Sequence, residues 1–170
     1  MKKVNTVGSR LGTDKAYIAG FLDGDGSIML QVKKRSDTKR GWRFMATICF
    51  YQDSRHEEPL HWIRQAIGVG YVSKRNDGMS ELRVNGFKQV RLLLTDLQPF
   101  IRFKQLQARA MITACELLEK GASALSKQEL MSLVGLVLLI QSENYSSHSK
   151  KTKKELLQVL GLTPYRLENK

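Results

Sequence analysis

Residues 16–27 read AYIAGFLDGDGS, and the interpretation of the whole chain depends on them. Apolar side chains recur in the first part at helical spacing, and Thr13 or Asp14 is suited to cap the N-terminus of such a helix. The following Asp-Gly-Asp-Gly, 23–26, is unfavourable in a helix interior because of its glycines. The stretch therefore predicts a helix that ends in an acidic turn.

Two carboxylates, Asp23 and Asp25, fall at the C-terminal end of this expected helix. The helix macrodipole already presents negative partial charge there, so an anion is unfavourable unless a cation accompanies it. Gly20 and Gly24 lie four residues apart on one helix face, where a second backbone can approach closely. We interpret the segment as a close-packing helix that delivers carboxylates to a divalent-metal site, with an ordinary amphipathic helix as the alternative.

Residues 18–26, IAGFLDGDG, closely resemble the LAGLIDADG motif and differ from it only by apolar or small-residue exchanges. A lone Asp-x-Asp-Gly is common in loops, whereas the nine-residue pattern followed by a strand is much more specific. The chain is similar to the LAGLIDADG homing endonucleases of the single-motif, homodimeric type. We find no second copy of the acidic motif.

Composition agrees with a nucleic-acid partner. The 170 residues suit a single domain, 1–170, and 28 basic against 16 acidic residues give a formal charge of +12. Such a charge points to a polyanion, with nucleic acid ahead of an anionic membrane surface. No segment approaches the roughly 20 apolar residues that span a bilayer, and no secretion signal is evident. Cys49 and Cys115 are isolated, so we expect an intracellular protein, cytoplasmic or organellar.

The remaining patterns predict an order of elements. After a loose basic arm, 1–12, and the first helix, we expect strands at 28–35, 42–51, 70–75 and 81–85, and helices at 60–67, 87–97, 104–120, 126–142 and up to Gly161. This order is αββαββα. The resemblance implies an α+β fold with an antiparallel four-stranded DNA-binding sheet and additional C-terminal helices.

One face of the expected sheet is polar and basic. Such side chains on a curved ribbon can contact base edges in the major groove. We expect DNA contacts from Gln31, Lys33, Arg35, Arg43, Tyr71, Ser73, Arg75, Glu81 and Arg83. A merely solvated face is the alternative, and for Glu81 an intramolecular salt bridge.

A basic loop, 149–154, falls where the family has a loop that holds DNA backbone phosphates. It supplies Lys150, Lys151 and Lys153. We expect these side chains to add affinity rather than specificity. A solvated lysine run is the alternative.

The resemblance also implies the catalytic residues. Asp25 matches the family's metal-binding carboxylate, and the Gly24 carbonyl is an expected co-ligand for a hard ion. We expect Mg²⁺, with Mn²⁺ or Ca²⁺ able to occupy the same site. Asp23 is expected to hold the end of the helix.

Three further positions follow from the same resemblance. Gln52 matches a polar residue that orders the metal-bound water. Lys104 matches the basic residue near the scissile phosphate, with a surface lysine at a helix start as the alternative. The family's second basic position aligns with His56, beside Arg55, and either residue is a candidate.

One motif per chain implies that two chains pair their motif helices to assemble two metal sites. The expected dimer interface consists of Ile18, Ala19, Gly20, Asp23 and Gly24.

The resemblance implies a Mg²⁺-dependent, homodimeric, intron- or intein-encoded enzyme that cuts both strands of a long, partly symmetric DNA target. The alternative is a non-cleaving RNA maturase or DNA-binding repressor on the same fold. Retention of Asp23 and Asp25 favours the enzyme. We expect neither a small-molecule substrate nor a membrane partner, because the basic residues sit on strands and loops rather than on one amphipathic helix.

Overall fold

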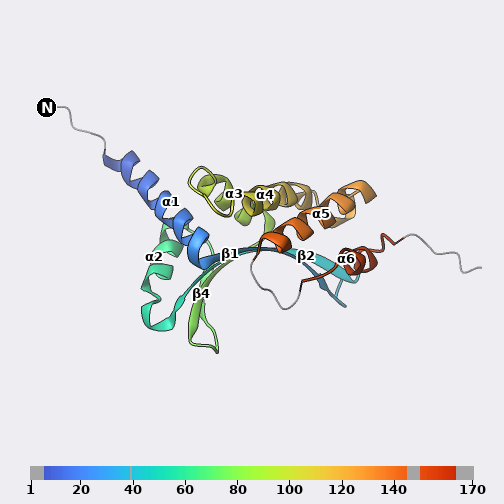
Figure 1. Cartoon of the computed structure of the whole chain (residues 1–170), viewed down its shortest axis with the longest axis horizontal. Helices are drawn as coiled ribbons and strands as arrows, with labels where there is room; N and C mark the ends of the chain where they lie inside the picture. Colours follow the sequence, from blue (N-terminus) through green and yellow to red (C-terminus); the bar gives the residue numbers. More distant parts are fainter. Residues whose placement is uncertain (1–5, 39, 145–149, 164–170) are drawn as a thin grey trace, which may run out of the picture.

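A computed structural model describes residues 6–163 apart from 39 and 145–149. The elements are α1 (Thr6–Asp25), β1 (Gly26–Lys34), β2 (Trp42–Asp53), η1 (Ser54–His56), α2 (Glu58–Ile67), β3 (Tyr71–Lys74), β4 (Met79–Asn85), α3 (Phe87–Leu97), α4 (Gln105–Glu119), η2 (Ala122–Ala124), α5 (Lys127–Glu143) and α6 (Lys153–Val159). The expected αββαββα order and the extra C-terminal helices are confirmed (Figure 1).

The first helix is longer than the sequence indicated. It begins at Thr6, inside the part expected to be a loose arm, so neither Thr13 nor Asp14 caps it. It also continues to Asp25 and passes directly into β1. A glycine inside a helix costs only about 1 kcal/mol relative to alanine, and the buried Leu22 holds this last turn against the core. Residues 1–5 of the expected arm lie outside the described part.

The corner between α1 and β1 requires a glycine. A Cβ added at Gly26 would lie 2.8 Å from the Leu22 Cα, which is closer than a real Cβ approaches another atom. Gly26 therefore lets the strand start immediately beside the end of the helix. This corner places Asp25 at the edge of the sheet.

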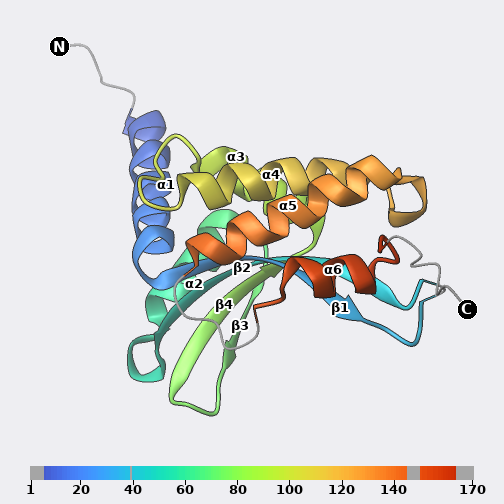
Figure 2. The same ribbon diagram turned by 45° about the vertical axis from the view of Figure 1, so that its right-hand side comes forward.

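The four strands form one antiparallel sheet in the order β1-β2-β4-β3. In Figures 1 and 2 the helices α3, α4 and α5 cover one face, and the other face is open. The covered face carries the core residues Ile28, Leu30, Val32, Phe44, Ala46, Ile48, Phe50, Leu82 and Val84, all at most 5% exposed. The period-two alternation of the sequence therefore has its expected outcome: one apolar face under helices and one polar face in solvent.

Within the described residues, no helix is long and apolar enough to cross a lipid bilayer. Cys49 and Cys115 are both free and buried.

Candidate active site and nucleic-acid interface

Asp23 connects two elements that are far apart in the sequence. Its carboxylate accepts hydrogen bonds from the backbone N–H groups of Arg102 (2.6 Å), Phe103 (3.2 Å) and Lys104 (3.0 Å), immediately before α4 begins. A carboxylate suits this place because it accepts three backbone N–H groups at once and lies at the positive end of the α4 helix dipole. The sequence led us to expect that Asp23 holds the end of its own helix, and the structure instead places its carboxylate on the start of α4.

Lys104 is bound to the same residue through its side chain. Its Nζ donates to the Asp23 backbone carbonyl at 2.5 Å, and the residue is only 8% exposed. Lys104 is therefore not a surface lysine. Burial lowers its pKa below the ordinary 10.5, while the negative charges of Asp23 and Asp25 oppose that shift.

Asp25 has the opposite surroundings. It lies exposed at the last position of α1, and within the described part of the chain its carboxylate makes no hydrogen bond or ion pair. The Gly24 carbonyl is among the last carbonyls of the helix, which lack intrahelical partners. Both are hard oxygen donors. Among the described residues, no three His, Cys, Asp or Glu side chains gather as metal ligands.

A surface hollow brings the expected residues together. It is lined by Gly24 and Gly26 from the α1–β1 corner, by Lys104, by Lys150 and Lys151, and by side chains of β1, β2 and α5: Ser27, Met29, Leu30, Gln31, Val32, Lys33, Lys34, Tyr51, Ile140, Gln141, Glu143 and Asn144. The acidic end of the motif, the buried lysine and two residues of the basic loop therefore share one concave site. The proximity of Lys150 and Lys151 to the motif was not predictable from the sequence.

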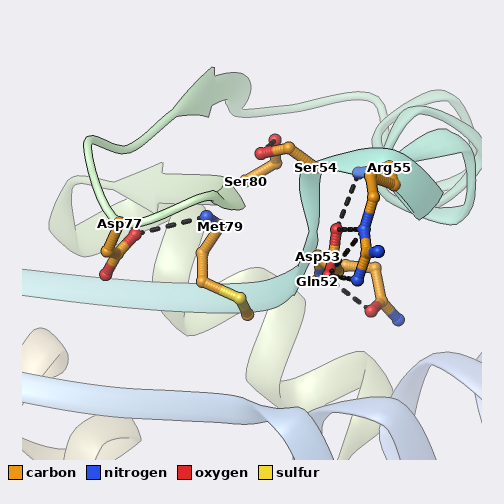
Figure 3. Close-up of polar contacts among 7 residues, drawn as sticks. All are labelled: Gln52, Asp53, Ser54, Arg55, Asp77, Met79 and Ser80. Atoms are coloured by element: carbon orange, nitrogen blue, oxygen red, sulfur yellow. Dashed lines mark hydrogen bonds and ion pairs between the residues drawn. The ribbon is translucent and has the colours of Figure 1, made fainter.

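Gln52 lies near this corner. Phe50 pairs with Gly26, so Gln52, two residues further along β2, lies just beyond the last pair with β1. Figure 3 shows its side chain turned back on its own strand, where Oε1 accepts a hydrogen bond from the Asp53 N–H at 2.8 Å.

The two candidates for the second basic position lie in η1. The Arg55 guanidinium folds back onto Asp53, with an ion pair of 2.7 Å (Figure 3), and Arg55 holds the pKa of the Asp53 carboxyl well below its usual range. His56 is exposed. Within the described chain, neither Arg55 nor His56 forms a hydrogen bond or ion pair with Asp25 or Lys104.

The open face of the sheet carries the expected polar side chains in a defined register. Lys33 lies opposite Arg43, and Arg83 lies between Cys49 and Tyr71 on the neighbouring strands. Gln31 and Ser73 lie on the same face. Arg35 and Arg75 follow the last residues of β1 and β3, and each pairs with a nearby aspartate, Asp37 and Asp77.

Glu81 differs from the expectation of a base contact. It is 7% exposed, and its carboxylate pairs with Arg83 at 2.8 Å, so the structure contains the intramolecular ion pair that was the alternative.

Sequence reasoning also missed Tyr51, which shares a hydrogen bond with Ser27 (3.0 Å) and lies under Arg75. Burial raises the pKa of Tyr51 to about 12. Period-two alternation along 42–51 places Tyr51 on the same face as Arg43, and its pairing with Glu81 confirms this.

The basic loop is shorter than expected. Thr152 caps α6 through a capping box with Glu155, so Lys153 opens that helix. Residue 149 lies outside the described part.

The expected dimer interface also needs correction. Ile18 and Ala19 are 2% and 0% exposed and pack into the chain's own core, and Asp23 is occupied by α4. Gly20 and Gly24 are exposed, and a Cβ added at either would meet nothing within 4 Å. The exposed stripe of α1 thus runs through the two glycines rather than through the larger residues.

Comparisons with known proteins agree with this geometry. The family model described as LAGLIDADG endonuclease matches residues 18–106. The DNA endonuclease I-CvuI of Chlorella vulgaris is 33% identical over 125 residues, covering 72% of this chain and 78% of the relative. The DNA endonuclease I-CreI of Chlamydomonas reinhardtii is 32% identical over 144 residues, 85% of this chain and 86% of the relative.

The fold comparison gives the same result. The crystal structure of I-CvuI in complex with its target, in the presence of 2 mM Ca, matches with a TM-score of 0.82 and 25% identity, over 92% of this chain and 99% of that one. The archaeal intron-encoded homing endonuclease I-Vdi141I, complexed with DNA, matches with a TM-score of 0.75 and 21% identity, over 88% and 96%. The chain belongs to the LAGLIDADG homing endonuclease family.

Proposed function

We propose that this chain is a site-specific homing endonuclease that makes a double-strand break in a long, pseudo-palindromic DNA target by metal-dependent phosphodiester hydrolysis. One observation carries the proposal: one hollow is lined by Gly24 and Gly26, which flank the exposed Asp25, by the buried Lys104 and by residues of the basic sheet face such as Lys33. Hydrolysis of a phosphodiester requires these three parts: ligands for a metal, a fixed positive charge and a polyanion-binding surface. An intracellular location, in the cytoplasm or an organelle, is part of the proposal because the substrate is DNA.

Mg²⁺ is the proposed cofactor. The Asp25 carboxylate and the Gly24 carbonyl are the oxygen ligands that this ion prefers, with phosphate oxygens of the substrate and a second chain supplying others. Structures of the relative I-CvuI on DNA are described in the presence of 2 mM Mg and of 2 mM Ca. When bound, a divalent ion would activate water and stabilise the charge that develops on the phosphate.

The chain's own residues complete the chemistry. Lys104 is held by the Asp23 carbonyl in a site that largely excludes water, so its charge is preorganised for a negative transition state. Gln52 would leave the Asp53 N–H and hold the attacking water. Arg55 or His56 would supply a second positive charge, and Arg55 would first have to leave Asp53.

A second copy of the chain is the proposed partner at α1. The stripe of Gly20 and Gly24 lets another backbone approach, and Asp25 lies at its end. Phe103, next to Lys104, is 85% exposed and offers apolar surface that a second chain would cover. Pairing of two α1 helices would bring two Asp25 residues together, one for each DNA strand.

The test is cleavage selection from a randomised duplex library in Mg²⁺, followed by sequencing of the cut ends. We expect one long, partly symmetric sequence to be cut on both strands. The matched control is Asp25→Asn, which keeps shape and removes charge, and it should bind the selected sequence without cutting it. Binding without cleavage by the unaltered chain would favour the maturase or repressor alternative instead.

A further inference from the structure

The last turn of α5 is fastened to both elements that carry the proposed catalytic residues. Asn144, directly after α5, donates from Nδ2 to the Ile28 carbonyl at 2.9 Å. Gln107 of α4 donates from Nε2 to the Glu143 carbonyl at 3.2 Å. Ile28 follows Asp25 by three residues, and Gln107 follows Lys104 by one helical turn. The end of α5 is therefore fixed relative to Asp25 and Lys104 together.

Lys150 and Lys151, two of the lysines that line the hollow, are attached to the same turn. Lys150 donates from Nζ to the Asn144 carbonyl at 2.9 Å, and the Lys151 N–H donates to the Gln141 Oε1 at 2.9 Å. An ammonium has three donors, so Lys150 keeps donors for a phosphate. Immediately afterwards Thr152 caps α6, which fixes the far side of this short segment.

Gln107 has an unusual balance of hydrogen bonds. The residue is 4% exposed, and its Oε1 is buried without a partner among the described residues. Leaving a buried acceptor unsatisfied costs at least as much stability as one typical hydrogen bond contributes. Net stabilisation of the fold therefore does not explain why residue 107 is a glutamine. The hydrogen bond from its Nε2, which fixes the end of α5 against α4, does explain it.

We propose that Gln107 and Asn144 are positioning residues that hold Lys150 and Lys151 over the active-site hollow, so that phosphate binding by these lysines is set by the position of Asp25 and Lys104. This inference rests on the proposed function. It predicts that loss of either amide weakens DNA binding even though neither side chain contacts DNA.

The first test is Gln107→Met, which keeps the length of the side chain and removes both polar ends. We expect an unchanged or slightly higher melting temperature, because the unsatisfied acceptor is removed along with the donor. The slope of log K against log salt, on the target selected above, should fall by about one to two per chain, the contribution of one or two phosphate contacts. The single-turnover cleavage rate at saturating DNA should change little.

Asn144→Leu should produce the same loss of slope, and Gln128→Met, an exposed glutamine at the other end of α5, should change neither quantity. Combining Gln107→Met with Lys150→Ala and Lys151→Ala should add little to the effect of the lysine substitutions alone. Full additivity, or an unchanged slope in Gln107→Met and Asn144→Leu, would overturn the inference while the unaltered chain still bound and cut DNA. An unaltered chain without salt-dependent DNA affinity would overturn the proposed function, and this inference with it.

Discussion

Asp23 and Asp25 stand two residues apart on one helix, yet their surroundings are opposite. Asp23 is 8% exposed and its carboxylate accepts three backbone N–H groups from the start of α4. Asp25 is exposed, and among the described residues it makes no hydrogen bond or ion pair. The difference separates an acidic motif into a structural anchor and a carboxylate that is free to bind a cation. Substitutions that affect one and leave the other intact test this division.

The largest effect is expected for Asp25→Asn. Removal of the charge should lower the cleavage rate by on the order of 10³-fold, the upper end of the range found when one preorganised electrostatic group is lost. Melting temperature and DNA affinity should change little, since Asp25 supports no fold contact. Cleavage assays in Mg²⁺, with chelation of the metal from the unaltered protein as the reference, measure this. Cleavage by the variant at the normal rate would contradict the metal-ligand assignment.

Gly20→Leu tests whether the role of Asp25 depends on a second chain. The added side chain has room in one chain, because nothing lies within 4 Å of a Cβ there. It would nevertheless block the approach of another backbone. We expect a monomeric mass in sedimentation and loss of cleavage, with the contacts of Asp23 unchanged. Leucine also favours helix by about 1 kcal/mol over glycine, so unfolding is not the expected cause of the loss. A dimer that cuts normally would place the interface elsewhere.

Lys104→Met tests the buried ammonium group that the Asp23 carbonyl holds in place. We expect cleavage to fall by about 10²-fold, because a buried cation next to the transition state is lost. DNA affinity should fall much less, since Lys104 is 8% exposed. Single-turnover rates and equilibrium binding separate the two effects, and Lys127→Met, at an exposed lysine, is the control. Equal losses in rate and affinity would make Lys104 a phosphate anchor only.

The sequence was sufficient for the motif helix, the order of elements along the chain and the polar sheet face, because each depends on local spacing. It was insufficient where long-range contacts decide. Nothing near Asp23 in the sequence indicates that its partners are the N–H groups before α4. The approach of Lys150 to the motif needs the packing of α5 on β1.

The expected interface residues Ile18 and Ala19 fail for a physical reason. The resemblance implied them, whereas burial in the chain's own core decides against them, because an apolar side chain that is already 0–2% exposed has no surface left for a partner. The glycines on the opposite side of α1 remain available.

Asp23→Ala should act mainly on the fold. Three N–H groups before α4 lose their acceptor, and we expect the free energy of unfolding to fall by about 2–4 kcal/mol, combining a lost cap with charge-assisted hydrogen bonds. Cleavage should decrease as well, because Lys104 loses its fixed position. Urea denaturation compares this variant with Asp25→Ala, for which a much smaller change is expected. Similar stability of the two variants would contradict the division between the carboxylates.

The smallest effect concerns pH. Burial lowers the pKa of Lys104 below 10.5, so between that lowered pKa and 10.5 the unfolded chain binds more protons than the folded one. The contribution of Lys104 to the free energy of unfolding therefore rises with pH between its lowered pKa and 10.5. It is least favourable below the lowered pKa. The stability advantage of Lys104→Met over the unaltered chain should therefore shrink as the pH rises from neutral toward 10.5, as measured by urea denaturation. A constant difference, as expected for Lys127→Met, would mean that the Lys104 ammonium is as well solvated in the folded chain as in the unfolded one. In that case the negative charges of Asp23 and Asp25 would fully offset the cost of burying the Lys104 ammonium.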